Sequence, residues 1–126
     1  MSALDLPATN GGEFRAEGSY DGATITVRCS GNADLRARDA LDALLVRLDT
    51  EAQRLKVGEV AVDVRDLEFM NSWCFKSFVS WIGRVQDLEP ARQYKIRFVS
   101  NPKMHWQQRS LHALRCFAVE LIRVDS

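Results

Sequence analysis

The chain has few cysteines and no long apolar run, and both shortages limit what it can be. Its 126 residues include Cys29, Cys74 and Cys116, which are widely spaced and form no Cys-x-x-Cys pair. This set argues against a disulfide framework and a cysteine zinc site, so we expect free thiols in or near the core. No apolar run approaches the roughly 20 residues of a membrane span, and the N-terminus lacks a signal-peptide pattern. We therefore expect a cytoplasmic protein without membrane insertion.

The chain also lacks an excess of either charge. Its 17 basic and 17 acidic side chains give a formal net charge of zero, which removes the usual electrostatic case for nucleic-acid binding. The two charges are unevenly distributed along the chain: acidic side chains outnumber basic ones in residues 1–90, and basic ones outnumber acidic ones in residues 91–126. The basic residues are scattered, which favours a mixed solvated surface over a basic patch.

Patterns of catalytic and metal-binding residues are absent as well. The sequence contains no Gly-rich phosphate loop, nucleophile elbow or Cys/His pairing. His105 and His112 would lie roughly 10 Å apart along one helical face, too far for a shared metal ion. Strand alternation would send Asp63 to one face of a sheet and Asp66 and Glu68 to the other. We therefore expect no enzymatic activity and no metal or cofactor.

The hydrophobic pattern predicts a flexible lead-in over residues 1–12 and one domain over residues 13–126. The Asp21-Gly22 pair predicts a tight turn that joins two strands in an antiparallel hairpin. Periods of two and of 3.6 residues predict the remaining elements. The expected strands are 13–19, 23–29, about 60–69, 94–100 and 118–124, and the expected helices are about 37–55, 73–88 and 104–116.

Strands and helices alternate after the hairpin. This order predicts a single α/β domain with right-handed crossovers. Its sheet should be mixed and mainly parallel, with about five strands, three main helices and the antiparallel hairpin at the N-terminus. Asn32 or Asp34 can cap the first helix, Gly58 is expected to end it, and Ser72 is a natural cap for the second.

The candidate functional site is the junction at Asn71-Ser72, where a strand passes directly into a helix. On a helical wheel, Trp73 lies with Ser77 and Arg84, away from the apolar half of the helix. An exposed tryptophan at such a position is typical of an interface hot spot. The alternative is a distorted first turn that lets Trp73 fold back over the sheet edge.

The strand that leads into this junction reads Val62-Asp63-Val64-Arg65-Asp66-Leu67-Glu68-Phe69-Met70-Asn71-Ser72. This stretch, with the element order from about residue 13, resembles the STAS family, the sulfate transporter and anti-sigma factor antagonist domain. Family members carry a Met-Asp-Ser-Ser-Gly-Leu-Gly type of sequence here, and the second Ser is phosphorylated by a partner kinase. Asp63 matches the strand Asp and Ser72 the first Ser. Trp73 stands at the phosphoacceptor position, Asn71 replaces Asp and Cys74 replaces Gly, so the resemblance implies a variant without the usual switch.

The resemblance implies a non-catalytic protein-interaction module in bacterial signalling, similar to the anti-sigma factor antagonists. Its partner would be a kinase or an anti-sigma-type protein. The residues expected to contact that partner are Asn71, Ser72, Trp73, Lys76 and Ser77 at the helix start, with Asn32 and Asp34 in the neighbouring loop.

Two further hypotheses stay open. Ser72 is a candidate phosphosite, because a phosphate at a helix N-terminus gains from unpaired N–H groups and the helix dipole, with Lys76 one turn further on. The chain could instead be a subunit of a transporter or scaffold assembly. A homodimer is compatible with each reading.

Overall fold

One sheet and a layer of helices make up the fold in the computed structural model, which describes residues 4–126. The sheet has the strand order β1-β2-β3-β4-β5-β6 within these residues. The strands are β1 (Thr9–Gly11), β2 (Phe14–Tyr20), β3 (Thr24–Ala33), β4 (Glu59–Met70), β5 (Lys95–Val99) and β6 (Ile122–Asp125). The helices are α1 (Arg38–Leu55), α2 (Ser72–Gln86) and α3 (His105–Phe117), with short 3-10 turns η1 (Leu35–Ala37) and η2 (Pro90–Arg92).

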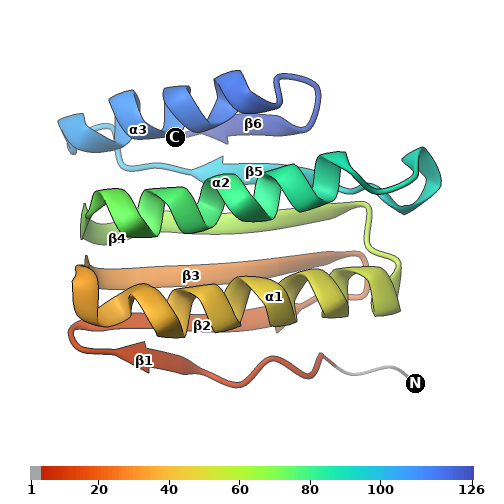
Figure 1. Ribbon diagram of the computed structural model, residues 1–126, viewed down its shortest axis with the longest axis horizontal. Coiled ribbons are helices and arrows are strands. Elements are labelled where there is room, and N and C mark those ends of the chain that lie inside the picture. Colours follow the sequence, from red (N-terminus) through yellow and green to blue (C-terminus); the bar gives the residue numbers. More distant parts are fainter. Residues whose placement is uncertain (1–3) are drawn as a thin grey trace.

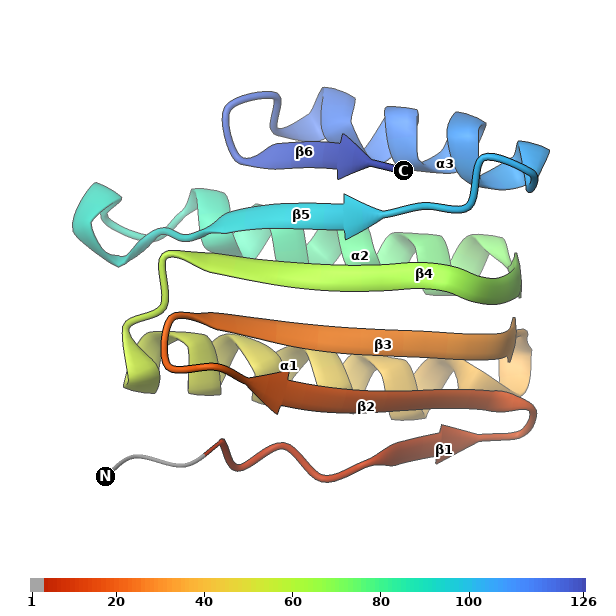
Figure 2. The ribbon, with the colours of Figure 1, turned by 180° about the vertical axis from the view of Figure 1, so that it is seen from behind.

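The three α-helices cover one face of the sheet and leave the other face open (Figures 1 and 2). The pairs β1–β2 and β2–β3 are antiparallel, whereas β3–β4, β4–β5 and β5–β6 are parallel. Each parallel pair is joined through one helix, as crossover connections require. The predicted mixed sheet with three main helices is therefore confirmed, with a sixth strand that the sequence pattern did not reveal.

The N-terminal hairpin follows the sequence prediction closely. β2 and β3 pair from Arg15 opposite Ser30 to Tyr20 opposite Ile25. The Asp21 carboxylate accepts the backbone N–H of Thr24 at 2.7 Å, and Gly22 has a φ of 96°, which favours glycine. The tight turn predicted at Asp21-Gly22 is thus confirmed.

Two boundaries near the chain ends differ from the prediction. Regular structure begins before residue 13, because β1 pairs with β2 from Thr9 opposite Ala16 onward. The predicted flexible lead-in also includes residues 1–3, which lie outside the described residues. The last strand is shorter than 118–124, because Leu121 donates its N–H to the carbonyl of Ala118 at 2.9 Å and so closes a turn before β6.

The ends of α1 were only partly predicted. Neither Asn32 nor Asp34 caps α1, whose N-cap is Ala37 and has no side-chain cap. Asp34 instead caps the preceding turn η1, because its carboxylate accepts the backbone N–H of Arg36 at 3.0 Å. Gly58 does not end the helix. Lys56 adopts the left-handed conformation with a φ of 54°, and Val57 donates its N–H to the carbonyl of Ala52 at 3.1 Å. These backbone bonds satisfy the last turn without a glycine.

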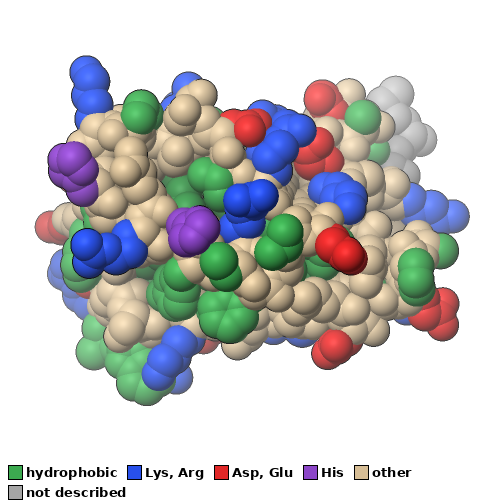
Figure 3. All heavy atoms as spheres, turned by 90° about the horizontal axis from the view of Figure 1, so that it is seen from above, with side chains coloured by type: hydrophobic (Ala, Val, Ile, Leu, Met, Phe, Trp, Pro, Cys, Tyr) green, Lys and Arg blue, Asp and Glu red, His purple; other side chains and the backbone are tan. Residues whose placement is uncertain are grey.

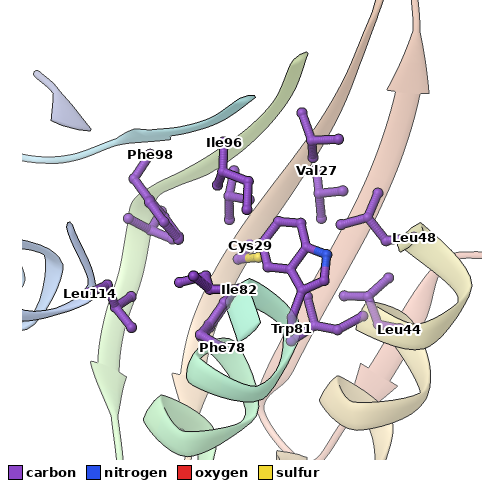
Figure 4. Packing of buried hydrophobic residues seen from close by; sticks show 14 of the residues in the cluster. Val27, Cys29, Leu44, Leu48, Phe78, Trp81, Ile82, Ile96, Phe98 and Leu114 are labelled. Carbon is purple, nitrogen blue, oxygen red and sulfur yellow. The ribbon is translucent and has the colours of Figure 1, made fainter. Parts of the chain in front are cut away.

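The core lies between the helical layer and the sheet (Figure 4). The apolar stripe of α2 is buried as predicted, and Trp81 donates its indole N–H to the hydroxyl of Tyr94 at 3.0 Å. Phe117, the last residue of α3, is exposed. Cys116 is also exposed, so the expectation of core thiols holds only for the buried Cys29 and Cys74. Within residues 4–126, no helix is both long and apolar enough to cross a membrane.

Candidate functional site

The junction between β4 and α2 consists of Asn71 alone. Its backbone N–H donates to the carbonyl of Ala33 at 2.9 Å and so ties the junction to the end of β3. Its side-chain oxygen accepts the N–H of Cys74 at 2.9 Å. Asn71 is therefore the N-cap of α2, and the prediction of Ser72 as the cap is wrong. Ser72 is the first helical residue and is exposed.

The segment before α1 lies beside this junction, as the sequence analysis expected. Asn32 and Phe69 are register partners at the ends of β3 and β4. The thiol of Cys74 contacts the carbonyl of Asp34, with 3.6 Å between sulfur and oxygen. Figure 1 shows the ends of β3 and β4 and the starts of α1 and α2 together at one end of the molecule. The two predicted parts of the site are thus brought together.

Trp73 lies on the surface, with 45% of its side chain exposed. The guanidinium carbon of Arg38 and the ammonium nitrogen of Lys76 are each 4.6 Å from its ring centroid. Both distances are within the range of a cation–π interaction, so the indole is held in place while it stays exposed. The alternative, in which Trp73 folds back over the sheet edge, is therefore wrong.

Two other large apolar side chains are exposed at this end of the molecule. Leu35 in η1 is 62% exposed, and Phe69 near the end of β4 is 48% exposed. We define the α2-start surface as Leu35, Arg38, Phe69, Trp73 and Lys76. Sequence reasoning missed Leu35, Arg38 and Phe69 as site residues. No local pattern identifies them, because their place at this end of the molecule depends on how η1, α1 and β4 meet α2.

The remaining predicted contact residues play different parts. Ser77 is buried and donates its hydroxyl hydrogen to the carbonyl of Trp73 at 3.2 Å, so its predicted place on the exposed side of α2 is wrong. Asn32 donates an amide hydrogen to the carboxylate of Glu13. The guanidinium of Arg36 binds the Asp34 carboxylate at 2.9 Å and lowers its pKa. Asn32 and Asp34 therefore border the α2-start surface with side chains that already have partners.

The acidic residues of β4 are arranged differently from the prediction. The pairing of β3 with β4 moves from Arg28 opposite Asp63 to Ser30 opposite Asp66, so β4 contains a β-bulge. The extra residue reverses the alternation, and both carboxylates border one hollow on the open face of the sheet. The prediction that they lie on opposite faces is therefore wrong.

Both of these carboxylates have cationic partners. Arg65 donates to Asp63 at 2.7 Å and lowers the pKa of that carboxyl group, and Arg28 lies 3.8 Å from Asp66. Glu68 is exposed further along the strand. An ion-paired Asp63 is suited to holding the bulge, and it lacks the raised pKa expected of a general acid.

The face over α3 shows no concentration of one charge. Basic, acidic and apolar side chains are mixed there, and the two histidines lie apart (Figure 3). One Cys/His contact that the sequence analysis did not reveal joins Cys116 and His112, with 3.7 Å between Sγ and Nε2. Within residues 4–126, no group of three or more His, Cys, Asp or Glu side chains could hold a metal ion.

Comparisons with known proteins identify the fold. No protein-family model and no curated sequence matches the chain. Among solved structures, an anti-sigma factor antagonist from Mycobacterium paratuberculosis matches with a TM-score of 0.66 and 13% identity, over 89% of this chain and 85% of that chain. The anti-sigma factor antagonist SpoIIAA, in its unphosphorylated form, matches with a TM-score of 0.58 and 16% identity, over 90% of this chain and 88% of that chain.

The protein has the STAS fold. The fold implied by the sequence resemblance at the β4–α2 junction is thus confirmed. In this STAS fold, Trp73 is the second residue of α2, directly after Ser72. At such low identities the similarity establishes the backbone fold only. It gives no information about the side chains of the α2-start surface.

Proposed function

We propose that this chain is a non-catalytic STAS-type module of bacterial signalling that binds a protein partner of the kinase or anti-sigma type. Binding would occur through the α2-start surface and would lack the usual phosphorylation switch. The observation that carries the proposal is the exposed indole of Trp73, held by Arg38 and Lys76 at 4.6 Å each. The fold shared with two anti-sigma factor antagonists supports the class of partner.

The α2-start surface has the composition of an interface centre. Tryptophan and arginine are enriched among residues that dominate binding energy, and such residues cluster where apolar area is exposed. Trp73 is flanked by two cations that restrict its movement, so a partner would immobilise little further side-chain freedom on binding. Leu35 and Phe69 add apolar area that would be buried with it.

The absence of a switch is proposed from the chemistry of position 73. In the resembled family this position carries the hydroxyl that accepts phosphate, and the indole of Trp73 has none. A bulky exposed aromatic group there would instead remain in the binding surface at all times. The chain would then act as a constitutive binder.

Affinity capture from lysate of the native host tests the proposal. Wild type, Trp73→Ala and Val119→Ala would be compared by quantitative mass spectrometry of captured proteins. Val119 is a suitable control because it is exposed in the turn before β6, near the C-terminal end of α2 and not at its start. A kinase-like or anti-sigma-like protein should be captured by wild type and Val119→Ala and lost with Trp73→Ala. Equal capture by Trp73→Ala would exclude the α2-start surface as the binding site.

Ser72 supports a second candidate function, a phosphorylation switch one residue earlier. The hydroxyl of Ser72 is exposed at the first helical position, and Asn71 already caps the helix in its place. Lys76 lies one turn further along α2, where a phosphate on Ser72 could reach it. Intact mass of protein purified from the native host would show one added phosphate, absent from Ser72→Ala protein.

The third candidate, a subunit of a transporter or scaffold assembly, predicts a different result from the same capture. A permanent partner would be recovered in fixed one-to-one proportion by wild type and Trp73→Ala alike. The outer edges of β1 and β6 are the surfaces to test in that case, because each strand has a neighbour on one side only.

A further inference from the structure

Two positive charges are brought together at the α2-start surface by different helices. Arg38 is the first residue of α1, and Lys76 lies one turn into α2. Because each charge lies 4.6 Å from the same ring centroid, the two are less than about 10 Å apart, which is about one Debye length at 0.1 M salt. A single ligand can therefore interact with both.

Neither of these cations forms an ion pair among the residues that the structure describes. Among residues 4–126, no carboxylate lies within 4.0 Å of Arg38 or Lys76. The neighbouring Arg36, by contrast, is paired with Asp34 at 2.9 Å. The negative faces of the Trp73 ring offset part of the repulsion between the two cations, but a π system carries no net charge. The surface therefore keeps two cations that form no ion pair beside an exposed aromatic ring, with the carboxylates of Asp34 and Asp42 near enough to act on the neighbouring Cys74 thiol.

We propose that the α2-start surface recognises an acidic segment of a partner protein. Carboxylates of that segment would bind Arg38 and Lys76, and an apolar side chain between them would cover Trp73 with Leu35 and Phe69. This inference rests on the proposed function and specifies the chemistry of the partner. Charge complementarity carries it, because the site has two unpaired cations around an apolar centre.

A protein segment fits these observations better than a nucleic acid. A nucleic-acid site needs many basic residues along a groove, whereas this chain has no net charge and exposes the apolar Leu35 and Phe69 at the same end of the molecule as Trp73. Carboxylates next to an apolar group match both parts of the surface. A partner with a basic face at this point would be repelled, so the two cations also provide specificity.

Peptide titrations followed by NMR test the inference directly. The probes are the peptide Glu-Glu-Leu-Phe-Glu-Glu and its isostere Gln-Gln-Leu-Phe-Gln-Gln, both with blocked termini. The signal is the indole N–H of Trp73, assigned by its loss in Trp73→Phe. The acidic peptide should shift this signal and bind at least about tenfold more tightly than the isostere at low salt, and added salt should reduce the difference.

Variants separate the site from general electrostatics. The double variant Arg38→Gln/Lys76→Gln should bind both peptides equally weakly. The control Lys103→Gln/Arg109→Gln removes two exposed basic residues at or near α3 and should bind like wild type. Equal binding of the two peptides by wild type, no shift with the acidic peptide, or preferential binding of a single-stranded DNA oligonucleotide would each overturn the inference.

Failure of this inference is distinguishable from failure of the proposed function. If the captured partner is lost with Trp73→Ala but kept by Arg38→Gln/Lys76→Gln, the surface binds a partner whose chemistry is not acidic. If Trp73→Ala keeps the partner, the surface itself is the wrong one.

Discussion

The side-chain oxygen of Asn71 accepts the backbone N–H of Cys74 at 2.9 Å, and this hydrogen bond starts α2. Asn71 therefore caps the helix, and Ser72, which the sequence pattern predicted as the cap, does not. The hydroxyl of Ser72 is thereby left exposed, and Trp73 follows it in the first turn. One capping interaction therefore leaves the candidate site residues Ser72 and Trp73 facing solvent.

Asn71→Ala should destabilise the protein, whereas Ser72→Ala should not. Loss of a side-chain cap typically costs about 1 kcal/mol, because the N–H of Cys74 loses its partner. Ser72→Ala changes only an exposed hydroxyl and should alter the free energy of unfolding by less than about 0.5 kcal/mol. Urea denaturation of the two variants measures the difference. A larger loss from Ser72→Ala than from Asn71→Ala would return the capping role to the serine.

Patterns that depend on local sequence predicted most of this fold. The Asp21-Gly22 pair identified the hairpin because its turn requires a positive φ, and valines at every second position of β4 identified a buried strand. The family resemblance, together with element order, indicated the STAS fold, since alternating strands and helices restrict the sheet to few topologies.

The features that were missed depend on contacts between distant segments. The bulge in β4 places Asp63 and Asp66 on the same face of the sheet. The alternation of apolar and polar residues along the strand does not reveal the extra residue. The pairing of β1 with β2 was hidden by a glycine-rich stretch. Arg38 reaches Trp73 because α1 and α2 lie side by side, which is a tertiary relationship. Hence the sequence placed Lys76 in the candidate site, whereas Arg38 could be assigned to it only from the fold.

Glu51 should make stability depend on acidic pH. Its buried carboxylate accepts hydrogen bonds from Arg54 at 2.7 Å and from the N–H of Asp5 at 2.6 Å, and the Arg54 interaction is the main reason that its pKa falls to about 2. The folded pKa lies below the ordinary value of 4.5, so this stabilisation is complete above pH 4.5 and is lost as the pH falls toward 2.

Glu51→Gln tests this dependence. The variant should lose about 1 kcal/mol at neutral pH, a modest amount because Arg54 is solvent-exposed. Its unfolding free energy should also change less than that of wild type between pH 6 and pH 3, with Glu120→Gln on the surface as the control. An unchanged acid profile would show that the Glu51–Arg54 interaction contributes nothing to stability.

The three cysteines should differ sharply in reactivity. Burial raises the pKa of Cys29 to about 12 and that of Cys74 to about 11, whereas Cys116 is exposed on α3. Because the thiolate is the reactive form, an aromatic disulfide reagent should modify one thiol per native chain rapidly and the other two only after unfolding. Cys116→Ser should abolish the rapid phase. A rapid phase that survives this substitution would place a second thiol at the surface.

The hydroxyl group of Tyr94, the residue directly before β5, links α1 and α2. This hydroxyl donates to Asp49 at 2.6 Å and accepts the indole N–H of Trp81 at 3.0 Å. Tyr94→Phe would leave the N–H of Trp81 without a partner in the core, so we expect a loss of about 1 to 3 kcal/mol at neutral pH. Tyr20→Phe, at a partly exposed tyrosine, should change stability by less than about 0.5 kcal/mol.

The same residue should make the protein sensitive to alkali. Burial, reinforced by the hydrogen bond to Asp49, raises the pKa of Tyr94 above its ordinary value of 10. An unfolded chain releases this proton near pH 10 while the folded chain retains it, so stability is complete below pH 10 and falls as the pH rises beyond it. Urea titrations at pH 9 and pH 11 should show a smaller loss for Tyr94→Phe than for wild type. Parallel losses in the two proteins would mean that Tyr94 ionises as readily in the folded chain as in the unfolded one, which its burial and its hydrogen bond to Asp49 oppose.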